Sequence, residues 1–213
     1  MSEIRARLVN RYYAVIKNSI GPVLRSGISP DALSFLGLAA SFAAALFFGM
    51  GLVFPGGLAL LFSGFLDTLD GSVARLTGRS NAAGALLDST LDRYAELAVF
   101  SGLLVYYRHG WMFAFVVLAL VGSVMASYVK ARAQSLGKVR TVGLMQRPER
   151  LALLIVGSLA NPLVELFLPE YPDVALSTAI VVLAVLSNGT ALRRLVEGRK
   201  DLSPRISSLT KGS

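Results

Sequence analysis

The chain has 213 residues and no cysteine; 54% of its residues are hydrophobic, only 16% are charged, and the formal net charge is +8. Soluble domains carry about 25% charged residues, so this composition excludes an ordinary soluble protein, and the lack of cysteine excludes disulfides. The length suits one domain, residues 1–213, and we expect an all-α integral membrane protein.

Residues 2–26 are predicted to form an amphipathic helix that lies in the membrane interface. Apolar side chains recur with helical spacing at Ile4, Leu8, Tyr12 and Val15, and basic residues occupy the other side. Such a helix buries its apolar face in lipid while its cations face anionic headgroups. Basic helices can also bind nucleic acid, but the aliphatic and aromatic face favours membrane lipid, so we expect no nucleic-acid partner.

Six apolar stretches follow, and each is long enough to cross a bilayer, because about 20 helical residues span the hydrocarbon. We predict transmembrane helices at about residues 32–53, 57–77, 82–107, 111–136, 149–168 and 173–196. Together the six transmembrane helices occupy about residues 32–196. Residues 197–213 are polar and are predicted to form a cytoplasmic tail.

The placement of basic residues predicts the orientation. All 21 lysines and arginines except Arg108 fall in the N-terminal helix, in residues 75–93 or 130–150, or in the segment from Arg193 onward. With six spans these segments share one side of the membrane. The positive-inside rule then predicts a multi-pass protein of the cytoplasmic (inner) cell membrane, with both termini and this basic face in the cytoplasm.

Four aspartates lie within sequence that otherwise has the composition of membrane-spanning helices. Asp67 and Asp70 are spaced i,i+3, and Asp88 and Asp92 are spaced i,i+4, so each pair shares one face of a helix. Carboxylates are costly in hydrocarbon, and four converging ones cannot all stay ionised without a cation. Hard divalent ions take such oxygen ligands, and Mg²⁺ usually binds alongside substrate phosphates. The sequence therefore predicts a two-metal site that handles phosphate groups.

The spacing from Asp67 to Asp92, D-x2-D-G-x2-A-R-x8-G-x3-D-x3-D, fills all eight fixed positions of a known signature. It resembles that of the CDP-alcohol phosphotransferases, integral-membrane enzymes of phospholipid head-group synthesis. The resemblance implies that Asp67, Asp70, Asp88 and Asp92 bind two Mg²⁺ ions, with Mn²⁺ as an alternative, and that Asp92 is the general base. The only histidine, His109, is expected on the opposite side of the membrane, which excludes a histidine base.

The resemblance also implies a donor, CDP-diacylglycerol or a CDP-diether lipid, and a set of residues that bind it. Arg75 can hold a pyrophosphate oxygen with two hydrogen bonds, and small neighbours let a ligand approach the backbone. A helix cap would by itself explain the segment from Ser29 to Ala32. The predicted CDP-lipid residues are Ser29, Pro30, Asp31, Ala32, Gly71, Ala74, Arg75, Asn81 and Gly84.

The acceptor is expected to carry its own phosphate, because Lys130, Arg150 and Arg194 would form a cationic pocket at helix ends near the aspartates. The segments Y-x-K-A-R-A from Tyr128 and R-P-E-R from Arg147 resemble those of prokaryotic phosphatidylinositol-phosphate synthases, which use inositol 1-phosphate. Glycerol 3-phosphate or another phosphorylated polyol is the alternative acceptor. The three cations also fit an ordinary positive-inside pattern.

Other readings remain open at this point. The carboxylates are compatible with a cation carrier, which would release no CMP. Glu96, one turn after Asp92, either tunes Asp92 or pairs with a basic residue, and pairing is favoured. The family resemblance implies a homodimer, for which the predicted third and fourth spans offer the small residues Gly102, Gly110, Gly122 and Ser123.

Overall fold

The computed structural model describes residues 14, 18–137, 143 and 145–209, and within this part of the chain every regular element is a helix. Residues 18–26 are helical and precede six labelled helices. These are α2 (Pro30–Gly49), α3 (Val53–Leu76), α4 (Ala82–Tyr106), α5 (Met112–Ser135), α6 (Arg147–Phe167) and α7 (Val174–Leu209). The all-α prediction is confirmed.

Local sequence explains where the helices near the aspartates begin. Ser29 is the extended N-cap of α2, and its hydroxyl accepts a hydrogen bond from the Ala32 N–H at 3.2 Å, with Pro30 in the first turn. Asn81 caps α4 in the same way, since its Oδ1 accepts from the Gly84 N–H at 2.8 Å. The short turn between α3 and α4 contains Gly78 at φ +67°, a conformation that glycine adopts readily. The turn and the Asn81 cap thus reverse the chain, so that α4 begins near the end of α3 that carries Asp67 and Asp70.

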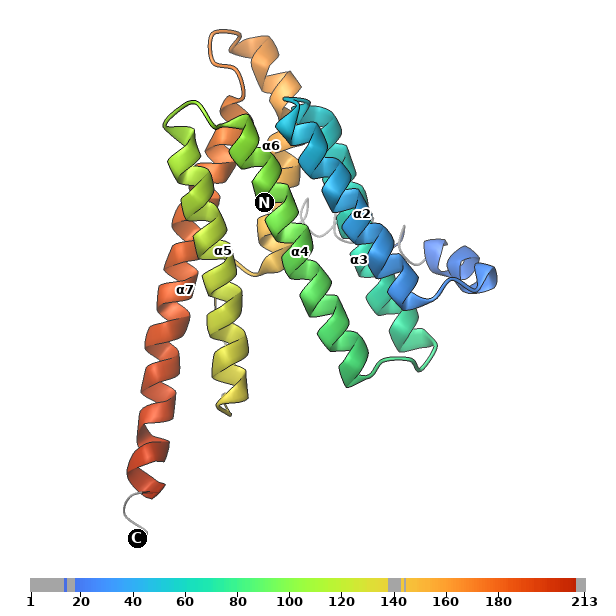
Figure 1. Ribbon diagram of the computed structural model, residues 1–213, viewed down its shortest axis with the longest axis vertical. Helices are drawn as coiled ribbons and strands as arrows, with labels where there is room; N and C mark the ends of the chain where they lie inside the picture. The colour runs from blue at the N-terminus through green and yellow to red at the C-terminus, as the bar shows by residue number, and fades with distance from the viewer. Residues whose placement is uncertain (1–13, 15–17, 138–142, 144, 210–213) are drawn as a thin grey trace.

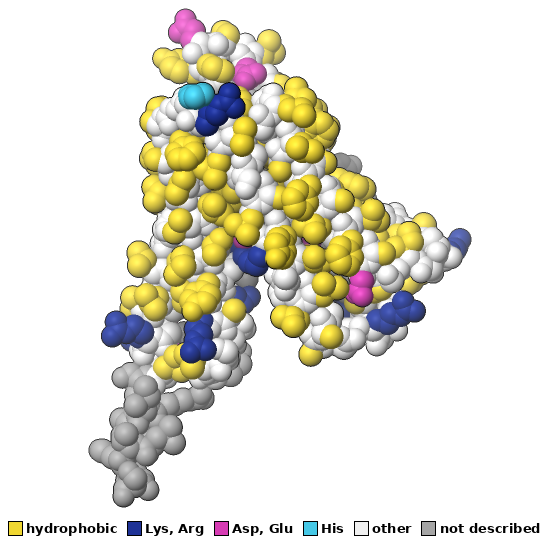
Figure 2. Space-filling view, in the orientation of Figure 1, with side chains coloured by type: hydrophobic (Ala, Val, Ile, Leu, Met, Phe, Trp, Pro, Cys, Tyr) yellow, Lys and Arg dark blue, Asp and Glu magenta, His cyan; other side chains and the backbone are white. Residues whose placement is uncertain are grey.

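The helices form two legs that diverge toward one end (Figure 1). One leg consists of α2, α3 and α4, and the other of α5 and α7, while α6 contacts both α3 and α7 and joins them. The main core lies where the legs meet and includes Phe48, Phe100, Leu103, Leu176 and Ile180. Figure 2 shows the hollow between the diverging legs, with charged side chains at its apex.

Five helices are long and apolar enough to cross a membrane: α2, α3, α5, α6 and residues Val174–Leu202 of α7. Apolar side chains cover much of the visible surface of the legs, as expected for a protein that faces lipid (Figure 2). The fold is therefore that of an α-helical membrane protein. The 25-residue α4 is long enough to cross as well, but it carries Asp88, Asp92, Arg93 and Glu96. The count of six spans stays a prediction.

The structure describes both ends of the chain only in part, and the C-terminal end differs from the expected pattern. The predicted interfacial helix falls partly outside the described residues, but Ile20 and Val23 in its last part pack against an apolar cluster formed by α2 and α3. The predicted tail from residue 197 is instead helical through Leu209, as a continuation of α7. An i,i+4 ion pair of 2.7 Å between Arg193 and Glu197 supports this continuation.

The small residues expected at a dimer interface are used inside the chain. A Cβ on Gly102 would lie 2.2 Å from the carbonyl oxygen of Ala45 in α2, so α2 and α4 touch through their backbones. A Cβ on Gly122 would lie 2.5 Å from Nδ2 of Asn188 in α7. Ser123 is also fully buried. The assignment of these three residues to a dimer contact is wrong, because helix packing within one chain already covers them.

Candidate active site

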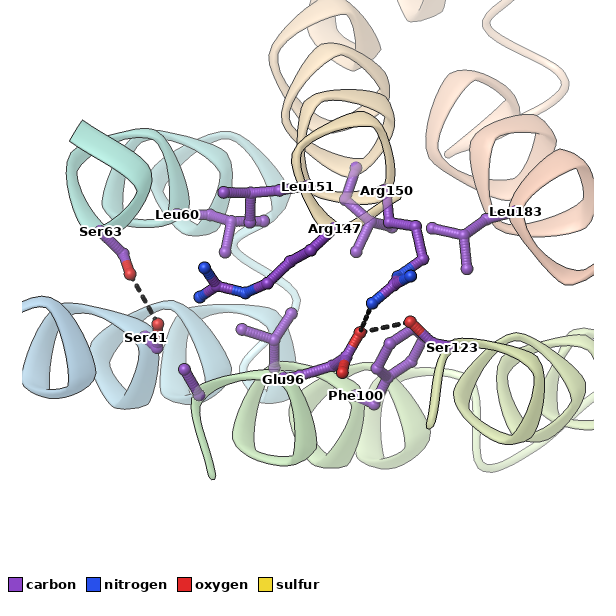
Figure 3. A pocket seen from close by; sticks show the side chains of 13 residues that line it. Ser41, Leu60, Ser63, Glu96, Phe100, Ser123, Arg147, Arg150, Leu151 and Leu183 are labelled. Atoms are coloured by element: carbon purple, nitrogen blue, oxygen red, sulfur yellow. Dashed lines mark hydrogen bonds and ion pairs between the residues drawn. The ribbon is translucent and has the colours of Figure 1, made fainter. Parts of the chain in front are cut away.

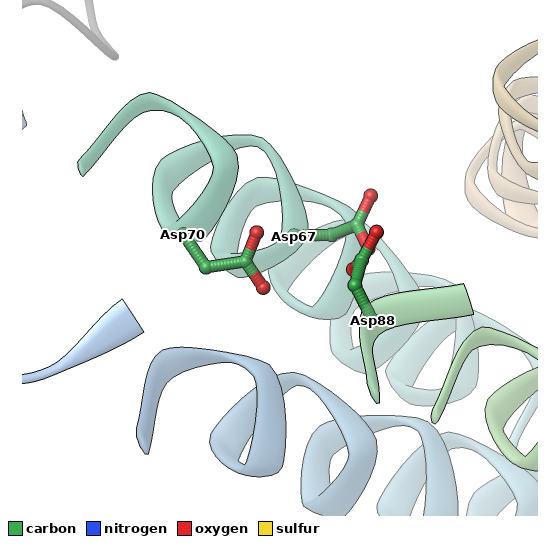
Figure 4. Close-up of side chains that lie close together, drawn as sticks. All are labelled: Asp67, Asp70 and Asp88. Carbon is green, nitrogen blue, oxygen red and sulfur yellow. The ribbon is translucent and has the colours of Figure 1, made fainter. Parts of the chain in front are cut away.

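The carboxylates of α3 and α4 converge on one another. One oxygen each from Asp67, Asp70 and Asp88 lies within 4.8 Å of the other two. Figure 4 shows the two α3 aspartates projecting toward Asp88 on α4. The i,i+3 spacing on α3 and the turn before α4 produce this arrangement. Three carboxylates at such separations repel one another, so the donor set fits a hard divalent cation with oxygen ligands.

The cluster has partners on two further helices. Asp70, which is 5% exposed, accepts a hydrogen bond of 2.6 Å from the Ser34 hydroxyl on α2. Asp67 accepts two hydrogen bonds from Nη1 of Arg147 on α6, at 3.0 and 2.9 Å. Asp92 lies outside the group of three but forms an ion pair of 2.6 Å with Nη2 of Arg147. The sequence predicted the four aspartates together; it did not predict that an arginine joins two of them.

A cleft of about 630 Å³ opens beside Asp70 and Asp88. Its volume is in the range of about 300–1,000 Å³ that is usual for small-molecule sites. Eight of the nine predicted CDP-lipid residues line it, and Ala32 does not. The lining residues are Ser29, Pro30, Asp31, Ser34, Asp70, Gly71, Ala74, Arg75, Arg79, Ser80, Asn81, Ala83, Gly84, Ala85, Leu87 and Asp88.

Arg79 and Ser80 in this lining were missed by the sequence reasoning. They belong to the turn between α3 and α4, and their adjacency to Asn81 was the available signal. Arg75 and Arg79 bring two exposed guanidinium groups to the cleft. An anionic ligand is the natural partner of such a pair.

Glu96 lies deeper between the legs, where it joins a buried polar network (Figure 3). It pairs with Arg93 at 2.5 Å and with Arg150 at 3.1 Å, and it accepts a hydrogen bond from Ser123 on α5. The expectation that Glu96 pairs with basic residues is confirmed. A small cavity of about 40 Å³ is lined by Glu96, Ser123 and Arg150 of this network and by Arg147, which also contacts Asp67 and Asp92.

The predicted acceptor residues occupy different surroundings. Arg150 and Arg194 are each 3% exposed, and both contact α5: Arg150 donates to the Ser127 hydroxyl at 3.0 Å, and Arg194 donates to the Ala126 carbonyl at 2.7 Å. Lys130 follows one turn later on α5 and is half-buried. The structure thus gathers the three residues along one stretch of α5, although two of them already have protein partners.

His109 lies beyond the end of α4 that is remote from the aspartates. Asp88 is in the second turn of this helix and Tyr106 is its last residue. Since an α-helix rises 1.5 Å per residue, these two positions are about 27 Å apart. A histidine base or ligand at the carboxylate cluster is therefore excluded.

Comparison with known proteins identifies the family. Residues 28–187 match the family model described as CDP-alcohol phosphatidyltransferase. The chain belongs to this family. An archaetidylinositol phosphate synthase from Methanothermobacter thermautotrophicus is 36% identical over 197 residues, which cover 92% of this chain and 96% of the relative. A phosphatidylinositol phosphate synthase from Mycobacteroides abscessus is 39% identical over 189 residues, which cover 86% of this chain and 83% of that protein.

Structures of family members agree with the fold. The crystal structure of Mycobacterium tuberculosis phosphatidylinositol phosphate synthase with CDP-DAG bound matches with a TM-score of 0.76 and 35% identity over 87% of this chain and 94% of that chain. The same enzyme in complex with manganese and citrate gives a TM-score of 0.75 at 35% identity, over 86% and 88% of the two chains. As a family member this chain is a transferase, and the family uses divalent metal ions.

Proposed function

We propose that this enzyme transfers the phosphatidyl group of CDP-diacylglycerol, or the corresponding group of a CDP-diether lipid, to the hydroxyl of inositol 1-phosphate. The products are the phosphatidylinositol phosphate, or its diether counterpart, and CMP. The observation that carries the proposal is the cleft of about 630 Å³ that opens onto Asp70 and Asp88. The names of the two relatives support inositol phosphate as the acceptor. Because one relative is archaeal and the other bacterial, they are compatible with either a diether or a diacylglycerol donor.

The cleft suits the nucleotide end of the donor. Arg75 and Arg79 supply cations for the diphosphate, which binds guanidinium groups through charge-assisted hydrogen bonds. Ser29 and Asn81 supply polar groups for the ribose or base, and Asn81 keeps its NH₂ group for this purpose because its Oδ1 caps α4. Gly71 and Ala74 leave space beside Asp70. The acyl or ether chains would extend along the apolar outer surface of the helices.

Asp67, Asp70, Asp88 and Asp92 are the residues that would hold two Mg²⁺ or Mn²⁺ ions. When bound, such ions supply positive charge that stabilises the transferring phosphoryl group and the departing CMP. Ser34 keeps Asp70 oriented toward the cluster through its 2.6 Å hydrogen bond.

Asp92 is proposed as the general base. The acceptor hydroxyl oxygen attacks the phosphorus that carries the lipid, the bond from this phosphorus to the oxygen shared with CMP breaks, and the hydroxyl proton passes to the Asp92 carboxylate. Asp92 suits this role because it lies one turn beyond Asp88 on α4, next to the cluster, and is only 15% exposed in its side chain.

Lys130, Arg150 and Arg194 are proposed to bind the phosphate of the acceptor. Their convergence on one stretch of α5 supports this assignment, as does the Nε of Arg150, which has no hydrogen-bond partner among the described residues although it is buried. A doubly charged phosphate would supply hydrogen-bond acceptors and negative charge to these three cations, whereas an uncharged polyol would supply no charge. Glycerol 3-phosphate, the acceptor of a phosphatidylglycerophosphate synthase, meets the same charge requirement.

We further propose that the enzyme lies in the cytoplasmic membrane with the active site on the cytoplasmic side, and that it forms a homodimer. The support for the orientation is the distribution of charge: Lys130, Arg147 and Arg199 lie toward the ends of helices on the side of the carboxylates, while Arg108 lies at the opposite end of α4. This placement gives water-soluble acceptors direct access to the site.

The test is an assay of the purified protein in lipid nanodiscs with labelled CDP-diacylglycerol, Mg²⁺ and each acceptor in turn. We expect CMP release with inositol 1-phosphate and little with glycerol 3-phosphate or free inositol. The variant Asp92→Asn should lower kcat by about 10²–10⁴-fold with unchanged CDP-lipid binding. Turnover with glycerol 3-phosphate alone would overturn the acceptor assignment, and solute flux without CMP release would indicate a carrier.

A further inference from the structure

Arg147 occupies an unusual place for a cation in this enzyme. It is the first residue of α6, and its guanidinium reaches α3 and α4 at once. Nη1 donates to both carboxylate oxygens of Asp67 at 3.0 and 2.9 Å, and Nη2 pairs with Oδ1 of Asp92 at 2.6 Å. No other lysine or arginine that the structure describes forms an ion pair with any of the four aspartates.

The oxygens that Arg147 holds belong to the proposed metal ligands. Asp67 is a member of the group of three carboxylates whose oxygens lie within 4.8 Å of one another. Arg147, Asp67 and Asp92 also line the same small cavity as Asp70 and Asp88. A guanidinium and a divalent ion in one such cavity repel each other, and this repulsion is strong because burial reduces screening by water.

We propose that Arg147 is a built-in counter-cation of the metal site, which pairs with Asp67 and Asp92 and offsets one of their two negative charges before metal binds, and which must leave them when divalent ions enter. Metal binding is then an exchange of one cation for others, and Arg147 sets the apparent metal affinity. The inference rests on the proposed function in one respect, that these aspartates bind divalent metal.

The exchange has a structural consequence for α6. The bridge from Arg147 is a polar tie between the start of this helix and the α3–α4 pair, while all four aspartates belong to α3 and α4 themselves. The residues just before α6 are held to α7 instead, since the Met145 N–H donates to the Thr190 hydroxyl at 3.3 Å. Displacement of Arg147 therefore removes one of two polar ties from the start of α6 to the leg that contains α3 and α4, while the ion pair between Arg150 and Glu96 of α4 remains.

The test measures Mn²⁺ binding to the purified full-length protein without lipid or acceptor, by electron paramagnetic resonance of the free ion. Arg147→Gln removes the competing cation, and we expect Mn²⁺ to bind about tenfold more tightly or better, as is typical of a lost coupling between sites. Arg108→Gln makes the same change of charge at the remote end of α4, beyond the screening length, and should leave the affinity within about twofold. Equal or weaker binding in Arg147→Gln would overturn the proposal.

Thermal unfolding supplies a second readout. Without metal, Arg147→Gln should unfold at a lower temperature than the wild type, because its carboxylates lack a counter-charge, and saturating Mn²⁺ should raise its unfolding temperature by more than that of the wild type. If the variant does not fold, structures of the wild type with and without Mn²⁺ decide the question. Ions bound while Arg147 still contacts both oxygens of Asp67 would refute the exchange.

These outcomes are separable from the proposed function. A wild type that binds Mn²⁺ more weakly than Arg147→Gln but releases no CMP from any CDP-lipid would contradict the transferase reaction and support the exchange. A wild type that releases CMP but binds Mn²⁺ as tightly as Arg147→Gln would support the reaction and contradict the exchange.

Discussion

Replacing Glu96 by alanine tests whether the buried network between the legs stabilises the fold. The change leaves the Arg150 guanidinium, whose side chain is 4% exposed, without its carboxylate, and only the neutral oxygens of Ser127 and Met145 remain as partners. Removing one member of a buried ion pair costs about 3–5 kcal/mol. For a chain of this size each kcal/mol lowers the unfolding midpoint by about 2–4 °C, so we expect a decrease of about 6–20 °C.

The assay is thermal unfolding in detergent micelles, followed by far-UV circular dichroism at one fixed scan rate. The matched control is Glu197→Ala, which breaks the ion pair with Arg193 on the exposed side of α7, where the side chains are 54% and 32% exposed. Exposed pairs contribute less than about 1 kcal/mol, so the control should shift the midpoint by no more than about 4 °C.

A double variant distinguishes the loss of the Glu96–Arg150 ion pair from the cost of leaving one buried charge without its partner. Glu96→Leu with Arg150→Met replaces both charges by apolar groups of similar size, and such replacements of buried pairs are often neutral or stabilising. We expect it to recover most of the unfolding temperature lost in Glu96→Ala, while losing acceptor binding. If Glu96→Ala shifts the midpoint no more than Glu197→Ala does, the ion pair with Arg150 does not hold the legs together, and the reasoning is refuted.

Three further predictions follow from single contacts. Gly102→Ala should abolish accumulation of folded protein in membranes, because its Cβ would lie 2.2 Å from the Ala45 carbonyl oxygen, whereas Gly110→Ala has open space and should accumulate normally in the same immunoblot. Arg75→Gln should raise KM for CDP-diacylglycerol about tenfold or more with a smaller change in kcat, since charge-assisted hydrogen bonds contribute about 1.5–3 kcal/mol; an unchanged KM would place the diphosphate elsewhere. Asp67→Asn should weaken Mn²⁺ binding measured by calorimetry, and retention of wild-type affinity would remove Asp67 from the ligand set.

Local signals predicted the parts of the site that lie close together along the chain. The N-caps at Ser29 and Asn81 form where the sequence indicated, because a cap depends on a few neighbouring residues. The aspartate cluster follows from helical spacing on α3 and α4 and the short turn between them. The cleft beside the cluster consists largely of predicted residues for the same reason.

Contacts between distant segments were not predictable in this way. Arg147 reaches Asp67 across 80 positions of sequence, and no periodicity specifies which of the basic residues near the membrane surface turns inward. The glycines of α4 and α5 were assigned to a partner chain because small residues suit any close helix contact, whether within a chain or between chains. The extension of α7 to Leu209 was missed because polar composition was taken to end the helix, although an exposed helix needs no apolar face beyond the bilayer.

The polar inner face of α4 also affects how the protein is assembled. An emerging helix with Asp88, Asp92, Arg93 and Glu96 partitions poorly into lipid by itself. The cations that pair with Asp92 and Glu96 from another helix, Arg147 and Arg150, belong to α6 and are synthesised some fifty residues later. We therefore predict that α4 enters the bilayer only when it is packed against α2 and α3, or after α6 has been synthesised. A nascent chain truncated after α5 should be recognised by membrane quality-control proteases and degraded.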